Sequence, residues 1–319
     1  ALVERHLLGG DCLNYGCVPS KALLRSAHAA ADAKRAAELG VEARDVRVDF
    51  PLVMERVRRL RSGLSPNDSA ARFKGLGVDV FLGEARFLSR EAVEVAGKTL
   101  RFSRAVIATG ARAAALPIPG LAEAGCLTNE TVFSLTELPP RLAVIGAGPI
   151  GCELAQAFAR LGSKVTLLEV APQILIREDP DAARLIQSAL EQDGVDILTG
   201  AKILGVERRG GARVVRLEHA GKALEPAVGA ILVGVGRAPN VEGLGLEEAG
   251  VRYGKTGVEV DEHLRTSNRR IFAAGDVCSA YKFTHVADAH ARIVIENALF
   301  WPRRRASEQE RARLDPVRD

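Results

Sequence analysis

Residues 9–21 read GGDCLNYGCVPSK and place two cysteines five residues apart at the expected start of a helix. The pattern predicts that this helix begins at Cys17 and stops at Gly40, with Pro19 in its first turn. A thiol at a helix N-terminus lies at the positive end of the backbone dipole, which favours the reactive thiolate. Lys21 follows Cys17 by one helical turn, so its ammonium group is predicted on the same face as the sulfur.

The spacing of Cys12 and Cys17 leaves two interpretations open. In a regular helix, residues five apart are separated by about 7.5 Å of rise, beyond the usual disulfide reach of about 4.4–6.8 Å between Cα atoms. A disulfide therefore requires an irregular turn, and Asn14 and Gly16 are residue types that permit one. The alternative is two unrelated buried thiols, because free cysteine often serves as a small hydrophobic residue and CxxxxC is not a common zinc or redox spacing.

The composition is that of a folded protein of about two domains. The chain has 319 residues, of which 47% are hydrophobic and 26% are charged. A net charge of +4, from 44 basic and 40 acidic residues, gives no case for nucleic-acid binding. Five scattered cysteines do not resemble a secreted disulfide framework. No apolar run approaches the roughly 20 residues of a membrane span, and no signal peptide precedes the first motif. We therefore expect a soluble cytoplasmic protein with neither a membrane nor a nucleic-acid partner.

The first four residues read as the end of a strand closed by the acid Glu4. In a dinucleotide-binding βαβ unit, an acid at this place accepts hydrogen bonds from a ribose. The glycine-rich turn expected about 20 residues upstream is not in this sequence, so an exposed terminal carboxylate is the alternative. Further along, residues 49–75 are Arg-rich with apolar positions at helical spacing, which predicts a second amphipathic helix covering the first.

Two segments repeat one order of elements: a β-meander, an apolar strand, a glycine and an arginine. The first has strands predicted at 78–82, 85–88, 92–95, 99–102 and 105–108, ending in Thr109-Gly110-Ala111-Arg112. The second has strands predicted at 203–207, 213–218 and 230–233, ending in Gly236-Arg237. The shared order favours two related nucleotide-binding domains over chance similarity of short apolar strands.

Residues 141–169 contain a strand, a glycine turn, a helix, a second strand and an acid, in the order of a dinucleotide-binding unit. The glycines make a tight turn, admit a pyrophosphate to backbone N–H groups and allow close packing of helix on strand. Glu169 favours NADH, because a carboxylate accepts from a ribose 2′-hydroxyl and repels a 2′-phosphate; the nearby Arg177 keeps NADPH as the minority alternative. The residues predicted to bind NAD(P) are Gly146, Gly148, Ile150, Gly151, Glu169 and Gly236.

A third candidate site follows the short strand before Gly275 and Asp276. Ligands of open α/β sheets bind at the carboxyl ends of strands, although a bare Gly-Asp pair also fits an ordinary turn. The histidines that follow, His285 and His290, lack a second cluster of ligands and are interpreted as a loop residue and a helix-face residue. No metal site is predicted, and the remaining cysteines, Cys126, Cys152 and Cys278, are interpreted as structural.

The segment GGDCLNYGCVPSK resembles, nearly residue for residue, the redox-disulfide motif of the class I pyridine nucleotide-disulfide oxidoreductases. These flavoenzymes include dihydrolipoamide dehydrogenase, glutathione reductase and mercuric reductase, and residues 278–290 look most like the mercuric-reductase-like branch. The resemblance implies an α/β fold with two Rossmann-like domains, each with a three-stranded meander. An FAD domain at 1–135 and 258–300 is interrupted by an NAD(P) domain at 136–257, and a basic polar tail follows at 301–319.

The resemblance also implies site residues and a mechanism. NAD(P)H passes hydride to the flavin, which reduces a Cys12–Cys17 disulfide; Cys17 is the thiolate beside the flavin and Cys12 the outer thiol that exchanges with substrate. From the residues alone Glu153 is an ordinary first-turn acid; by resemblance it pairs with Lys21 beside the flavin. The implied catalytic residues are Cys12, Cys17, Lys21 and Glu153, and the implied FAD-binding residues are Glu4, Gly10, Asp11, Lys21, Ala85, Thr109, Gly110, Gly275 and Asp276.

The resemblance covers residues 1–300. Family members continue with an interface domain that builds a homodimer and carries a His-Glu pair, so the chain is expected to be truncated at both ends and to lack the dimerisation domain. The expected function is FAD-dependent NAD(P)H:disulfide oxidoreductase, mercuric reductase-like, with a thiol, disulfide or metal ion as substrate. The alternatives are a dihydrolipoyl dehydrogenase-like enzyme and an inactive nucleotide-binding remnant.

Overall fold

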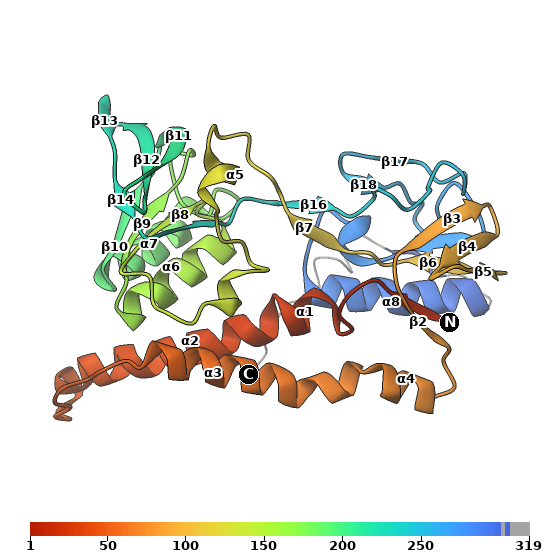
Figure 1. The fold of residues 1–319 in the computed structure, drawn as a ribbon, viewed down its shortest axis with the longest axis horizontal. Coiled ribbons are helices and arrows are strands. Elements are labelled where there is room, and N and C mark those ends of the chain that lie inside the picture. The colour runs from red at the N-terminus through yellow and green to blue at the C-terminus, as the bar shows by residue number, and fades with distance from the viewer. Residues whose placement is uncertain (301–303, 307–319) are drawn as a thin grey trace. The chain divides into compact units, whose positions relative to one another are not determined.

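The computed structural model describes residues 1–300 and 304–306, which fold into two compact α/β units (Figure 1). The first unit consists of Ala1–Leu8, Asn67–Arg112 and the chain from Arg237 onwards, and the second of Gly9–Pro66 and Ala113–Gly236. The short strands β7 (Ala111–Ala113) and β16 (Arg237–Pro239) pair with each other close to two of the points at which the chain changes unit.

A four-stranded parallel sheet forms the centre of the second unit. Its order is β10-β9-β8-β15, and its strands are β8 (Arg141–Ile145), β9 (Lys164–Leu168), β10 (Val195–Leu198) and β15 (Ala230–Val233). β8 and β15 are apolar and almost wholly buried, as expected of parallel strands covered on both faces. The helices α6 (Pro149–Leu161) and α7 (Pro180–Gln192) pack on β9 and β10 respectively. The strand–turn–helix–strand unit predicted at 141–169 is therefore confirmed.

An antiparallel meander covers this sheet within the same unit. Its strands are β11 (Lys202–Arg209), β12 (Ala212–His219), β13 (Lys222–Leu224) and β14 (Ala227–Val228), and the short helix α5 (Leu121–Ala124) and the 3₁₀ turn η3 (Val132–Ser134) precede the sheet in the chain. Val215 and Leu217 of β12 share a buried apolar cluster with Ile231 of β15. The second predicted meander is thus present.

Two long helices of the second unit lie side by side (Figure 1). α2 (Cys17–Arg35) runs into the 3₁₀ turn η1 (Ala36–Leu39) and stops at Gly40, whose φ of 76° places it in the left-handed region, as predicted. α3 (Phe50–Leu64) packs on α2, and Arg56 donates a 2.9 Å hydrogen bond to the Ala22 carbonyl.

The single helix predicted over residues 49–75 is wrong. α3 ends at Leu64, the 3₁₀ turn η2 (Ser65–Asp68) follows, and a separate helix α4 (Ala70–Gly75) comes after it. The reason is local: Pro66 has no N–H to continue the helical hydrogen bonding. The Ser69 hydroxyl then accepts from the Arg72 N–H and begins the new helix, as Asp49 does for α3.

The first unit contains small sheets around two apolar clusters. Two parallel pairs are β1 (Leu2–Glu4) with β2 (Val80–Leu82) and β6 (Ala105–Ile107) with β19 (Ile271–Ala273). The predicted first meander is β3 (Ala85–Ser89), β4 (Ala92–Val95) and β5 (Lys98–Arg101). The remaining elements are β17 (Tyr253–Gly254), β18 (Gly257–Val258), the 3₁₀ turn η4 (Gly275–Val277) and α8 (Thr284–Leu299).

Within residues 1–300 and 304–306, no helix is both long enough and apolar enough to cross a bilayer. The domain boundaries predicted at 135/136, 257/258 and 300/301 stay predictions, since the two units group the chain by contacts and not by ligand. Most of the predicted tail at 301–319 lies outside the described residues.

Candidate functional site: a cysteine turn, a glycine turn and a Gly-Asp turn

The two cysteines lie on either side of a sharp turn in the second unit. Cys12 is in the one-and-a-half-turn helix α1 (Gly10–Asn14), and Cys17 is the first residue of α2. Gly16 between the helices has φ −125° and ψ −115°, and a Cβ placed on it comes within 3.3 Å of the Cys12 Cα. The chain thus makes the kind of irregular turn that a Cys12–Cys17 disulfide would require. Both cysteines are half-buried, and their pairing as a disulfide stays a prediction.

Local packing explains Gly9 and Asn14 of this stretch, whereas Gly10 has a positive φ of 59° and open space around its Cβ position. Gly9 has φ 93°, and a Cβ there would lie 2.3 Å from the Leu13 Cδ2, so a larger residue is excluded. Asn14 is buried, and its side-chain amide donates to the Gly10 carbonyl at 2.9 Å. These contacts hold α1 in place and with it the position of Cys12.

Lys21 and Glu153 meet as predicted. The Lys21 Nζ lies 2.9 Å from both carboxylate oxygens of Glu153, which is 132 residues away in sequence. The side chains are 62% and 42% exposed, so the pair contributes at most about 1 kcal/mol to stability. Its importance is geometric, because it joins the cysteine-bearing α2 to α6, the helix that follows the glycine turn. The catalytic roles of these residues stay predictions.

The three motif glycines of the second unit have three different physical reasons. Gly146 has φ 98°, and a Cβ on it would lie 2.6 Å from Val235. A Cβ on Gly151 would lie 1.9 Å from the Gly146 carbonyl oxygen, so this glycine lets α6 pack against the strand end. Gly148 has an ordinary φ of −74°, and no heavy atom of the described chain lies within 4 Å of its Cβ position. Neither backbone strain nor packing requires a glycine at this position; Gly148 is the N-cap of α6, and the space around it is open.

Polar groups surround this glycine turn. α6 begins at Pro149, and within the described chain no side chain caps its first N–H groups, including those of Ile150 and Gly151. Glu169 at the end of β9 accepts from the Ala147 N–H at 2.7 Å and from the Ala171 N–H at 2.9 Å. An ionised carboxylate has about four acceptor sites, so Glu169 retains capacity for ribose hydroxyls.

Cys152, in the first turn of α6, carries an unreactive thiol. Its thiol is buried and donates to the Ala147 carbonyl at a sulfur–oxygen distance of 3.4 Å. Burial, followed by the carboxylates of Glu169 and Glu153, raises the pKa of Cys152 to about 12. The thiol therefore stays protonated at neutral pH, which agrees with the structural role predicted for it.

Two cations converge on the Gly275-Asp276 turn in the first unit. The Asp276 carboxylate lies 3.4 Å from the Arg237 Nε, and the Lys282 Nζ donates to the Asp276 carbonyl at 2.7 Å and to the Ser279 carbonyl at 3.1 Å. The Gly275 N–H donates to His290 Nδ1 at 3.3 Å. Burial, partly opposed by Asp276 and reinforced by Arg237, lowers the pKa of Lys282. Hydrogen bonds to the backbone and an ion pair to the Asp276 carboxylate therefore hold this turn in place.

Asn240 braces a second turn of the first unit. Its backbone carbonyl accepts from the Thr109 hydroxyl at 2.7 Å, and its side-chain amide donates to the Thr109 carbonyl at 2.9 Å. Gly110 has φ 67° and open space around its Cβ position. Glu4 ends β1 as expected and accepts from the His6 N–H at 2.8 Å. The sequence therefore placed these turns correctly at strand ends.

The predicted residues divide between the units. The cysteine and NAD(P) residues belong to the second unit: Gly10, Asp11, Cys12, Cys17, Lys21, Gly146, Gly148, Ile150, Gly151, Glu153, Glu169 and Gly236. The other FAD residues belong to the first: Glu4, Ala85, Thr109, Gly110, Gly275 and Asp276. Sequence reasoning missed Asn240 and Lys282. Asn14 was noticed as a residue that permits a turn but not as a donor to the Gly10 carbonyl, and Arg237 was noticed as part of the repeat but not as a partner of Asp276. No group of three or more His, Cys, Asp or Glu side chains suited to a metal occurs in the part of the chain that the structure describes.

A family model described as pyridine nucleotide-disulphide oxidoreductase matches residues 1–291. A mercuric reductase of Staphylococcus aureus is 37% identical over 300 residues, covering 94% of this chain and 55% of that protein. A dihydrolipoyl dehydrogenase of Geobacillus stearothermophilus is 37% identical over 305 residues, which cover 92% of this chain and 63% of that protein. A solved structure of the HOCl-induced flavoprotein disulfide reductase RclA from Escherichia coli superposes with a TM-score of 0.83 at 31% identity. The superposition covers 96% of this chain and 66% of that one. The chain spans about half to two thirds of the length of these relatives.

Proposed function

Because this chain belongs to the pyridine nucleotide-disulphide oxidoreductase family, we propose that it works as an FAD-dependent NAD(P)H:disulfide oxidoreductase with Cys12 and Cys17 as its redox pair. The observation that carries the proposal is the contact between Lys21 and Glu153, 2.9 Å from nitrogen to oxygen. It ties the helix that begins at Cys17 to the helix that begins at the dinucleotide turn. Two motifs far apart in sequence thereby belong to one body of the protein.

The glycine turn of the second unit fits a dinucleotide. The open space at Gly148 and the uncapped N–H groups of Ile150 and Gly151 suit a pyrophosphate, and Glu169 suits an adenine ribose. The carboxylate at this position favours NADH over NADPH. The Gly236 turn, with φ 56° and open space, completes the set proposed for NAD(P)H.

The turns of the first unit fit the remainder of an FAD site. Gly275 and Gly110 have positive φ values, and Gly110 also has open space at its Cβ position, so a ligand can approach the backbone there. The residues proposed to hold FAD are Glu4, Gly10, Asp11, Lys21, Ala85, Thr109, Gly110, Gly275 and Asp276. The finer architecture, an FAD domain at 1–135 and 258–300 interrupted by an NAD(P) domain at 136–257, belongs to the same proposal.

FAD, when bound, supplies a redox relay between nicotinamide and sulfur. The chain's own chemistry is thiol exchange: the reduced pair attacks a substrate disulfide through the Cys12 thiolate and releases one thiol. Cys17 then attacks the mixed disulfide, which releases the second thiol and re-forms the Cys12–Cys17 bond. Cys17 is the first residue of α2, and Lys21, one helical turn further on, is held by Glu153.

The substrate class is proposed from the relatives. Their names indicate mercuric ion and a dihydrolipoyl group, and one solved structure of RclA is a Cu(II) complex. A thiophilic metal ion or a small disulfide therefore suits the cysteine pair, with dihydrolipoyl dehydrogenase-like activity and an inactive nucleotide-binding remnant as the alternatives. A homodimer, as in the family, and a cytoplasmic location stay predictions.

One experiment tests the proposal. The purified 319-residue chain is reconstituted with FAD, titrated with NADH and assayed for NADH oxidation with Hg²⁺, Cu²⁺ or lipoamide. We expect a yellow protein with a long-wavelength thiolate–flavin band after reduction, and loss of that band in Cys17→Ser. Cys126→Ser, which removes a half-buried cysteine elsewhere in the unit, is the matched control and keeps the band. Full turnover by Cys17→Ser contradicts the proposed role, and a colourless chain that binds NADH supports the remnant.

A further inference from the structure

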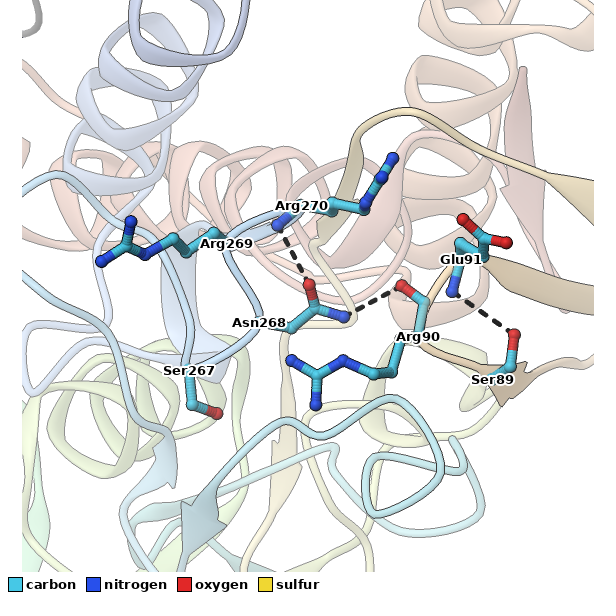
Figure 2. Close-up of a pocket in the computed structure, with 7 residues that line it drawn as sticks. All are labelled: Ser89, Arg90, Glu91, Ser267, Asn268, Arg269 and Arg270. Carbon is cyan, nitrogen blue, oxygen red and sulfur yellow. Dashed lines mark hydrogen bonds between the residues drawn. The ribbon is translucent and has the colours of Figure 1, made fainter.

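A pocket in the first unit lies away from the turns discussed above (Figure 2). Its volume is about 710 Å³, within the range of about 300–1,000 Å³ usual for small-molecule sites. It is lined by Ser89, Arg90 and Glu91 from the β3–β4 hairpin and by Ser267, Asn268, Arg269 and Arg270 from the loop before β19. Because that loop enters β19 at its amino end, the pocket lies at the opposite end of this strand from Gly275 and Asp276.

The lining is strongly cationic. Three of its seven residues are arginines, and none of the three has a carboxylate partner among residues 1–300 and 304–306. Other arginines of this unit do have such partners, as in the pairs Arg86–Glu248, Arg252–Glu259 and Arg265–Asp261. The one acid of the pocket, Glu91, is already paired with Arg101. The positive charge of the pocket is therefore available to a ligand.

A buried asparagine fixes the loops that carry these arginines. Asn268 is 3% exposed, and its amide donates to the Arg90 carbonyl at 3.0 Å and to the Ala249 carbonyl at 2.8 Å. Its side-chain oxygen accepts from the Arg270 N–H at 3.0 Å. Figure 2 shows the three arginine side chains fanning out around this asparagine. Arg90 also rests on Gly250, where an added Cβ would lie 2.5 Å from its terminal nitrogen.

We propose that this pocket binds a small polyanion, a molecule that carries at least two phosphate or carboxylate groups. Guanidinium groups match both anions through paired N–H donors, and three of them exceed what a single anionic group requires. The described lining contains no aromatic side chain on which a nucleobase could stack, so the ligand is a polyanion without a base and not a nucleotide. The site is separate from the proposed cofactor turns and does not depend on the proposed function.

The test is calorimetric titration of the 319-residue chain with tripolyphosphate and, separately, with citrate, in low salt and with NADH in excess to fill the dinucleotide turn. We expect saturable binding of at least one probe with a dissociation constant below about 1 mM. The probe that binds more tightly distinguishes a phosphate ligand from a carboxylate ligand. Because arginine stays protonated, the affinity is expected to follow only the ionisation of the probe between pH 6 and 9.

The decisive variant is Arg90→Gln/Arg269→Gln/Arg270→Gln, which we expect to bind at least about tenfold more weakly, since each charge-assisted contact is substantial. The matched control is Arg47→Gln/Arg59→Gln/Lys222→Gln, which removes the same charge from exposed positions of the other unit and should bind like the wild type. Circular dichroism checks that both variants are folded. The proposal is overturned if neither probe binds in the presence of NADH, or if the two triple variants bind alike.

Discussion

Gly148 and Gly151 stand three residues apart in one turn, and replacing each by alanine is expected to damage different properties. At Gly151 the new Cβ would lie 1.9 Å from the Gly146 carbonyl oxygen, a backbone atom that cannot rotate away. Real Cβ contacts essentially never fall below 3.0 Å, so strand end and helix must separate by more than 1 Å. Overpacking of this kind costs about 3 kcal/mol of unfolding free energy.

Gly148→Ala meets no such obstacle. Its φ of −74° suits alanine and the surrounding space is open, so only the weaker N-cap preference of alanine is lost, at most about 1 kcal/mol. The methyl group instead enters the open space beside the turn, into which the proposed pyrophosphate would bind. We expect NADH to bind at least about tenfold more weakly, equivalent to about 1.4 kcal/mol.

Denaturant unfolding and NADH fluorescence titration measure the two effects separately. Gly63→Ala serves as the control, because Gly63 lies exposed in α3 with no neighbouring atom of the described chain within 4 Å. Alanine there should raise the unfolding free energy by about 0.5–1 kcal/mol through helix propensity alone. The reasoning is refuted if Gly151→Ala is as stable as Gly63→Ala, or if Gly148→Ala binds NADH with wild-type affinity.

Three further predictions concern the surrounding contacts. The Cys152 thiol ionises near pH 9 when unfolded but holds its proton to about pH 12 when folded, so stability falls with rising pH in that window. In Cys152→Ala, the fall in unfolding free energy with pH should be smaller by up to about 1.4 kcal/mol per pH unit. Urea unfolding at about pH 9–11 measures this fall, and the same fall in wild type and variant would contradict the prediction. A double-mutant cycle on Lys21→Met and Glu153→Gln should give a coupling free energy of unfolding below about 1 kcal/mol, because both side chains are exposed to solvent. A coupling of several kcal/mol would contradict the solvent exposure of this pair. Asp193→Ala should cost about 3–5 kcal/mol, because it removes the carboxylate 2.7 Å from the guanidinium of Arg160, a side chain only 12% exposed. A change below about 1 kcal/mol in thermal unfolding counts against this.

Local backbone features could be predicted from the sequence. The glycine turn at 146–151 with its flanking strands, the stop of the first helix region at Gly40 and the irregular turn at Gly16 each depend on backbone preferences of a few neighbouring residues. The same reasoning failed over residues 49–75, where helical periodicity outweighed the one residue, Pro66, that interrupts it. The resemblance of residues 9–21 to a redox motif also correctly indicated the family.

The sequence by itself therefore determined the strand–turn–helix units, their strand-end acids and the family. Only the tertiary structure decided which distant side chains meet: Lys21 with Glu153 across 132 residues, Lys282 and Arg237 at the Asp276 turn, and three arginines around Asn268. The physical reason is the distance along the chain over which each kind of interaction acts. Backbone preference and periodicity act within about one or two turns of chain, whereas these contacts follow from how sheets and helices pack, and a lysine or asparagine without a motif gives no sign in advance of where packing will place it.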